Sequence, residues 1–278
     1  MGKKTPKRMN DNLLEAAKNG RVEELKLCLA NGANIDYQQR GGWTALMSAA
    51  SAGHVEVCRL LLENRCNKDI TSQFGQTALM VAAMEGHVKV CRLLLENRCN
   101  KDITAGIGWT ALMWAAREGH VEVCRLLLEN RCKKDITSED GVTALMWAAR
   151  GGHVEVCQLL LEKRCNKDIT SVSGRTALMW AARLGRVEVC QVLLENRCNK
   201  DIRDREGRTA LHLAAEEGKL QVTRCLIEQG GISPLVKTFK GETPYDLAAA
   251  IKQGQYKWRE YKEVTEYLKV HNIFISKY

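Results

Sequence analysis

Apolar residues recur along most of the chain in two patterns, and each pattern is typical of a short helix. In residues 108–140, the segment Thr110–Glu118 places three small or apolar side chains on one helical face, namely Leu112, Ala115 and Ala116. The segment His120–Asn130 carries a wider apolar stripe, which we expect to be buried on two sides. Gly119 separates the two segments, and the polar connector that follows them ends at a glycine, which favours a hairpin turn.

This stretch is repeated with a fixed period. With the copy at Gly108, near copies begin every 33 residues, at Gly42, Gly75, Gly141, Gly174 and Gly207. A weaker copy begins at Gly241, after a step of 34 residues. A period of this length predicts an array of stacked units, because one pair of short helices cannot bury its own apolar surface. The prediction is therefore an all-α solenoid that forms one elongated domain.

The copies at the two ends differ from those in the middle, and they predict the domain boundaries. We expect a flexible basic leader at residues 1–9 and an N-terminal capping repeat at 10–41. Six full repeats follow at 42–240, and a degenerate C-terminal repeat with a capping helix at 241–278. The capping helix is predicted by apolar residues at helical spacing, namely Tyr261, Val264 and Leu268. Alternatively, this helix docks a partner with Tyr256 and Trp258 exposed.

The repeated motif G-x-T-A-L-x-x-A-A-x-x-G-H-V-E-V-x-x-L-L-L, spaced at 33 residues, resembles the ankyrin repeat over roughly residues 10–271. The resemblance implies an ankyrin repeat solenoid, in which helix-turn-helix units are joined by β-hairpin connectors. It also implies that the first helix of each unit lines a concave face. Proteins that share this framework bind unrelated targets, so the resemblance does not name a partner.

Two departures from the family pattern affect the expected packing. The family's T-P-L-H motif ends in methionine in five units, at Met47, Met80, Met113, Met146 and Met179, so we expect packing where a histidine would tie neighbouring repeats by hydrogen bonds. The glycine that the family places after the second helix is replaced by arginine, at Arg65, Arg98, Arg131, Arg164 and Arg197. Because that glycine ordinarily has a positive φ, the geometry of these five turns stays open.

The formal net charge of +9 at pH 7 raises the question of an acidic or nucleic-acid partner. Four of the basic residues, Lys3, Lys4, Lys7 and Arg8, lie in the first eight positions, so much of the excess is a terminal tail that could also act as a weak nuclear signal. The sequence contains neither an apolar run of about 18 residues nor an apolar secretory leader, so we expect neither a membrane segment nor a secretory signal. The reduced cysteines that are described next favour the cytoplasm or the nucleus as the compartment.

Ten of the twelve cysteines fall in two columns of the repeat, one within the second helices and one just after them. Stacked helices are about 8–10 Å apart, which exceeds the roughly 7 Å that a disulfide spans between Cα atoms, so we expect reduced thiols within each column. No C-x-x-C pair occurs, and we expect no metal and no cofactor. The first column is interpreted as small core residues, whereas the role of the second stays open.

The sequence contains no enzyme signature. The histidines at His54, His87, His120 and His153 occupy one repeat position, directly after the glycine between the helices, and we expect them to make hydrogen bonds at that turn. There is no G-x-S-x-G motif, no phosphate-binding glycine loop and no H-E-x-x-H motif. We therefore expect a non-enzymatic protein.

Positions that vary between otherwise similar repeats are the candidates for partner contact. The residue after T-A-L-M is tryptophan in three consecutive repeats, and the residue three positions later is arginine, so the two side chains share a helical face and can stack. The predicted partner-binding ladder consists of Trp114, Arg117, Trp147, Arg150, Trp180 and Arg183, and Trp109, Arg175 and Arg208 are expected at its rim. Alternatively, the tryptophans only cover the seams between repeats, and the variable hairpin tips bind the partner.

Three functions remain open at this stage. The main hypothesis is a monomeric scaffold that binds an acidic or extended segment of a partner protein or peptide on the concave face, because tryptophan and arginine are enriched in binding hot spots. The alternative is binding of single-stranded nucleic acid or a nucleotide through the Trp-Arg ladder. The third is a structural spacer, or a regulator that binds another copy of itself.

Overall fold

The computed structural model describes residues 6–250 and 258–275, and it divides into two compact units, Met1–Glu139 and Asp140–Tyr278. All regular elements within the described residues are helices, which confirms the all-α prediction. The helices of the first unit are α1 (Pro6–Lys18), α2 (Val22–Ala30), α3 (Ala45–Ser51), α4 (Val55–Glu63), α5 (Ala78–Met84), α6 (Val88–Glu96), α7 (Ala111–Glu118) and α8 (Val121–Glu129). The helices of the second unit are α9 (Ala144–Gly151), α10 (Val154–Glu162), α11 (Ala177–Arg183), α12 (Val187–Glu195), α13 (Ala210–Glu216), α14 (Leu220–Glu228), α15 (Pro244–Ala249) and α16 (Trp258–Ile275).

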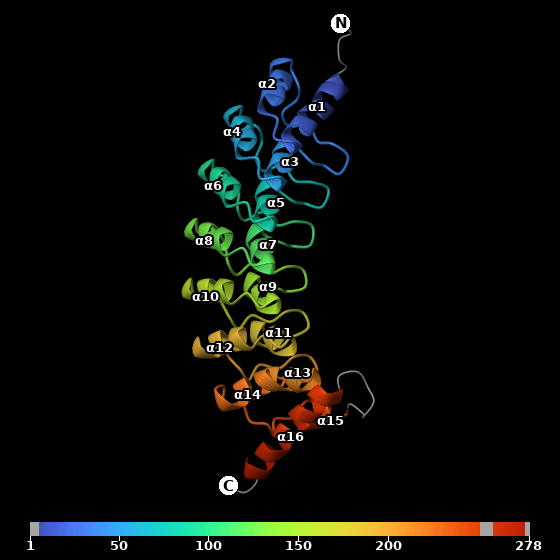
Figure 1. Cartoon of the computed structure of the whole chain (residues 1–278), viewed down its shortest axis with the longest axis vertical. Helices are drawn as coiled ribbons and strands as arrows, with labels where there is room; N and C mark the ends of the chain where they lie inside the picture. Colours follow the sequence, from blue (N-terminus) through green and yellow to red (C-terminus); the bar gives the residue numbers. More distant parts are fainter. Residues whose placement is uncertain (1–5, 251–257, 276–278) are drawn as a thin grey trace. The chain divides into compact units, whose positions relative to one another are not determined.

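Within each unit the helices form two adjacent layers. The first helices of successive repeats stack on one another, as α3 does on α5 and α5 on α7, and the second helices form a parallel layer, as α4, α6 and α8 do. Figure 1 shows the hairpin connectors projecting from the first helices, on the side away from the second helices. We call this side the first-helix face.

The connectors are tight turns and not extended strands. In one of them the backbone N–H of Ser72 donates to the carbonyl of Gln76 at 2.9 Å, and the N–H of Gly75 donates to the carbonyl of Ser72 at 2.8 Å. One backbone hydrogen bond joins this turn to the previous one, from the N–H of Gln73 to the carbonyl of Gly41, and the Gln38 side-chain amide donates to the carbonyl of Thr71. Because each turn makes so few cross-bonds, no strand is formed in the part of the chain that the structure describes.

A threonine begins nearly every first helix. Thr110 is in an extended conformation, and its hydroxyl accepts the N–H of Met113 at 3.2 Å, which satisfies one of the free donors at the start of α7. Gly119, with φ of 78°, ends the same helix in the left-handed conformation, as the sequence predicts. Helices of seven to nine residues are not stable alone, so their stability comes from packing between repeats.

The methionine column confirms the prediction of packing. All five methionines are only 1% exposed, within the layer of first helices. In the sixth repeat the family histidine is present as His212, whose Nδ1 accepts the N–H of Thr209 at 3.2 Å and whose Nε2 lies 3.2 Å from the carbonyl of Glu242 in the next repeat. Apolar packing and an inter-repeat hydrogen bond thus occupy the same position in different repeats.

The histidines after the first helix make a different bond from the one we expected. The Nε2 of His87 lies 2.9 Å from the carbonyl of Ser51, and the Nε2 of His120 lies 2.9 Å from the carbonyl of Met84. Both carbonyls belong to the preceding repeat, so these rings join neighbouring repeats and do not bond within their own turn. The ring is close to the preceding turn because Gly53 has no Cβ, and an added Cβ would lie 2.8 Å from His87.

The five arginines that replace the family glycine keep its backbone conformation. Their φ values lie between 56° and 59°, in the left-handed region that disfavours side chains with a Cβ. All five are exposed at the ends of the second helices: Arg65, Arg98, Arg131, Arg164 and Arg197. The turn therefore has the family geometry, and the arginines carry a steric cost that glycine would avoid.

The two ends of the chain differ in how well they match the predicted boundaries. α1 begins at Pro6, four residues before the expected start of the first repeat at Asn10, since proline is well suited to the first position of a helix. The last helix, α16, buries Val264 and Leu268 completely in a small core with Ala215 and Ala248. Trp258 is half-buried, with Lys262 Nζ 5.4 Å from its ring centre, and Tyr256 lies outside the described residues.

Candidate functional site

In the second unit, two tryptophans and two arginines alternate on the first-helix face. Trp147 and Arg150 lie on α9, Trp180 lies on α11, and Arg175 precedes α11 in the hairpin connector. The Arg150 guanidinium carbon is 5.3 Å from the ring centres of both Trp147 and Trp180, and the Arg175 guanidinium carbon is 5.3 Å from that of Trp180. These distances fit cation–π contacts. We call these four residues the Trp-Arg stack.

The arginines of this face differ in their acidic partners. The Nε of Arg183 donates to Glu217 at 2.9 Å. Arg208 makes ion pairs with Asp204, Glu206 and Glu216 at 2.9, 2.9 and 3.1 Å. By contrast, within the described residues no carboxylate lies within ion-pair distance of Arg150, whose side chain is exposed.

The two rim arginines of the second unit are largely buried. The side chains of Arg175 and Arg208 are 15% and 11% exposed, and both lie beside the buried carboxylate of Asp204, at 3.8 Å and 2.9 Å. Burial lowers the pKa of Arg175, and the positive charges of Arg183 and Arg208 lower it further. These two arginines therefore offer little of their own surface to a partner.

In the first unit, three of the predicted site residues form a cluster. The ring centres of Trp109 and Trp114 are 4.3 Å apart with a tilt of 46°, and the Arg117 guanidinium carbon lies 5.5 Å and 5.6 Å from them. Trp109 is only 6% exposed, so it packs beneath the cluster and does not form an open rim. Arg117 also lies 3.4 Å from Glu118.

The three tryptophans of the predicted ladder are only partly accessible. Trp114, Trp147 and Trp180 are each half-buried. The indole Nε1 atoms of Trp114 and Trp180 are buried without a hydrogen-bond partner in the described part of the chain. Part of each ring is therefore buried, and an arginine guanidinium lies over each of the three rings.

Hairpin tips carry a second set of exposed apolar side chains. In the first unit the exposed tip residues are Phe74, at 73%, and Ile107. In the second unit they are Val172 and Phe239, the latter at 72%. The sequence did not single out Phe239, since the 34-residue step before Gly241 moves its tip out of register. The backbone N–H of Phe239 donates to the carbonyl of Glu206, which identifies it as the equivalent tip residue.

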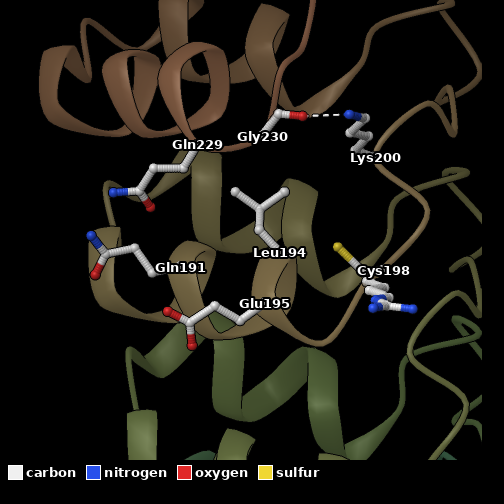
Figure 2. Close-up of a pocket in the computed structure, with 8 residues that line it drawn as sticks. Gln191, Leu194, Glu195, Cys198, Lys200, Gln229 and Gly230 are labelled. Carbon is white, nitrogen blue, oxygen red and sulfur yellow. Dashed lines mark hydrogen bonds between the residues drawn. The ribbon is translucent and has the colours of Figure 1, made fainter.

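A pocket of about 380 Å³ opens between α12 and α14, on the layer of second helices (Figure 2). Leu194 lies at its centre and is half-buried, whereas the equivalent Leu128 and Leu161 are 8% exposed. At this end of the pocket α14 is followed by Gln229 and two glycines, where the preceding full repeats have asparagine or lysine and then arginine. Its other lining residues are Gln191, Glu195, Arg197, Cys198, Lys200, Gln229 and Gly230, and Lys200 Nζ donates to the Gly230 carbonyl.

The cysteine that lines this pocket is a weak nucleophile. Burial raises the pKa of the Cys198 thiol to about 12, with a further contribution from Asp168, so the thiol is protonated and weakly nucleophilic at neutral pH. Burial has the same effect on Cys58 and Cys91 of the first column. Among the described residues no cysteine forms a disulfide, and no group of three metal-binding side chains comes together.

Comparisons with known proteins agree with the motif and with the stacked helices. A family model described as ankyrin repeats in three copies matches residues 62–140 and 130–204. Models described as ankyrin repeats in many copies match residues 13–62 and 193–248. A comparison with curated proteins returned no match. No helix in the described residues is long and apolar enough to cross a membrane.

Proposed function

Because the chain belongs to the ankyrin repeat family, we propose that it is a non-enzymatic scaffold that binds a partner protein or peptide on its first-helix face. Ankyrin repeats are generally protein–protein interaction modules, which supports this class of function. The proposal places binding on the side that the family uses as its concave face.

The observation that carries the proposal is the Trp-Arg stack. Arg150 lies against two indole rings, Trp147 and Trp180, that come from adjacent first helices. Stacking restricts the guanidinium before any partner arrives, so binding incurs less loss of side-chain entropy. Tryptophan and arginine are also the residue types most enriched among interface residues that dominate affinity.

The other predicted residues have graded roles in this proposal. Trp114 and Arg117 form the contact surface of the first unit, and Arg183 extends the contact surface of the second. Trp109, Arg175 and Arg208 position their neighbours from below, because they are mostly buried.

Binding of single-stranded nucleic acid has less support. Two guanidinium groups already lie over the Trp180 ring, so a base would have to displace one of them before it could stack. Four carboxylates of the same face, at Asp204, Glu206, Glu216 and Glu217, would also repel a phosphate backbone.

We place this function in the cytoplasm or the nucleus. The cysteines are mostly buried within the repeats, and burial keeps thiols such as Cys91 protonated at neutral pH. Free thiols in this number fit a reducing compartment.

The experiment that tests the proposal is a nuclease-treated pull-down from cell extract, quantified for the native chain and for the double variant Trp147→Ala, Arg150→Ala. Arg92→Ala is the matched control, because Arg92 is an exposed arginine on the second helix α6. Circular dichroism first establishes that all three chains are folded. We expect partner proteins to be lost from the double variant and retained by the control.

An identical set of partners for all three chains would contradict the proposal. Recovery of nucleic acid in the absence of nuclease, with binding that weakens steeply between low and moderate salt, would favour the alternative function.

A further inference from the structure

Arg150 differs from the other arginines of the first-helix face in one respect. Its guanidinium is held by two rings, yet within the described residues it has no carboxylate within ion-pair distance. Arg183 and Arg208, on the same face of the same unit, are both neutralised by acidic side chains of the chain itself. The stack therefore presents one oriented positive charge without a counter-charge.

The geometry of a stacked guanidinium selects its ligand. When its faces lie against aromatic rings, its N–H donors remain available at the edges of the plane. Two parallel N–H donors match the two oxygens of a carboxylate, and the half-buried indoles around Arg150 exclude part of the solvent that would weaken the contact. A lysine could not make the same bidentate contact.

The surroundings of Arg150 limit how many negative charges a ligand can carry. The next first helix, α11, presents Arg183 already bonded to Glu217, and beyond it Arg208 is bonded to Glu216. A second acidic group on the ligand would meet these carboxylates in place of a free cation. A phosphate backbone or a polyacidic segment is therefore disfavoured, whereas a single carboxylate is not.

The spacing between neighbouring first helices predicts how far apart the contacted residues lie in the sequence of an extended ligand. Neighbouring packed helices are about 8–10 Å apart, and an extended chain advances about 3.3 Å per residue, so the position opposite Arg183 is about three residues from the position opposite Arg150.

We propose that Arg150 binds the side-chain carboxylate of one aspartate or glutamate in an extended partner segment, and that the Arg183–Glu217 pair disfavours a second acidic residue three positions away. This inference rests on the proposed function, because it names the chemistry of a partner at the same surface.

The test begins with selection of random 12-residue peptides displayed on phage against the immobilised full-length chain. Enriched peptides are then synthesised with a fluorescent label, and their affinities are measured by fluorescence anisotropy. We expect enriched sequences to align on one acidic residue with an uncharged residue three positions away on one side. Arg150→Gln should weaken binding by about tenfold to a hundredfold, which is the range for hydrogen bonds to a charged group.

A double-mutant cycle identifies the contact itself. If Arg150 bonds the peptide carboxylate, changing that residue to its amide causes a similar loss, and the two changes together cause little more than either alone. Arg150→Lys should restore only part of the affinity, because it supplies charge without the bidentate geometry. Arg92→Gln, which lies outside the surface, should change affinity by less than about twofold.

A separate variant tests the exclusion of a second charge. Glu217→Gln removes the carboxylate bonded to Arg183, so it should strengthen binding of peptides with a second acidic residue by at least about threefold relative to the native chain, in the range of a weak ion pair. No gain would overturn the spacing preference.

The outcomes separate the two proposals. Enriched peptides that depend on Trp147 but lack an acidic residue, or losses that are additive in the cycle, would overturn the role of Arg150 and leave the binding face intact. Failure of any enriched peptide to respond to Trp147→Ala would overturn the proposed function together with this inference.

Discussion

Arg98→Gly is expected to stabilise the protein, although it removes a long side chain from the surface. Arg98 is exposed directly after α6, with φ of 57°, and makes no ion pair within the described residues. A left-handed conformation costs a residue with a Cβ about 1–2 kcal/mol, and glycine is free of that cost. The same position is occupied by Gly32 in the first repeat, with φ of 82°.

The expected gain is smaller than the steric cost alone. Glycine loses more conformational freedom on folding than other residues, which offsets about 0.5–1 kcal/mol. The net stabilisation expected for one substitution is therefore about 0.5–1 kcal/mol. Replacing all five left-handed arginines with glycine should stabilise the protein by about 2.5–5 kcal/mol, since the sites lie a full repeat apart and should act independently.

Urea denaturation followed by circular dichroism measures the effect as a shift in midpoint without a change in slope. Arg92→Gly is the matched control, because Arg92 is an exposed arginine in the interior of α6, where glycine should destabilise by about 1 kcal/mol. Arg98→Ala retains a Cβ, so it should lie within about 0.5 kcal/mol of the native chain. If Arg98→Gly destabilised the protein as much as Arg92→Gly, the assignment of strain to these turns would be wrong.

Two further predictions concern histidines that join repeats. His87→Ala removes the hydrogen bond to the carbonyl of Ser51, so it should destabilise the protein by about 1–2 kcal/mol in the same urea assay. A loss of stability below about 0.5 kcal/mol would contradict the inter-repeat role of this histidine. Burial lowers the pKa of His212, and its Nδ1 must be unprotonated to accept the N–H of Thr209. The stability that neutral His212 contributes is therefore present above the unfolded-state pKa of about 6.5 and is lost as the pH falls below that value. The unfolding free energy of the native chain should therefore fall more between pH 7.5 and pH 5 than that of His212→Met, and equal pH dependence of the two chains would refute this assignment.

The repeat architecture was predictable from local patterns. Each helix contacts its own repeat and the adjacent copies, so one unit and its period contain most of the information needed for the array. Thr110 and Gly119 also predicted where α7 begins and ends. The start of α1 at Pro6 was not predictable, because the charged residues around it do not form an apolar pattern with helical spacing.

The candidate site was predictable only in part. Trp147 and Arg150 share a helix, so their contact followed from a spacing of three residues. The acidic partners of Arg175, Arg183 and Arg208 were not predictable in the same way, since several of them lie in other elements. The pocket beside Leu194 was not predictable either, because no sequence motif marks its lining residues.

The amino-acid sequence alone determined the repeat, the all-α class and the residue types on each helical face, because these depend on period and on side-chain polarity. Only the tertiary structure decided which charges remain without a counter-charge and which rings remain accessible. Arg150 and Arg183 occupy the same position in successive repeats, yet Glu217 neutralises only the second. Such differences arise because burial and ion pairing depend on distances of a few ångströms to groups in the neighbouring repeat, and the repeat pattern does not contain those distances.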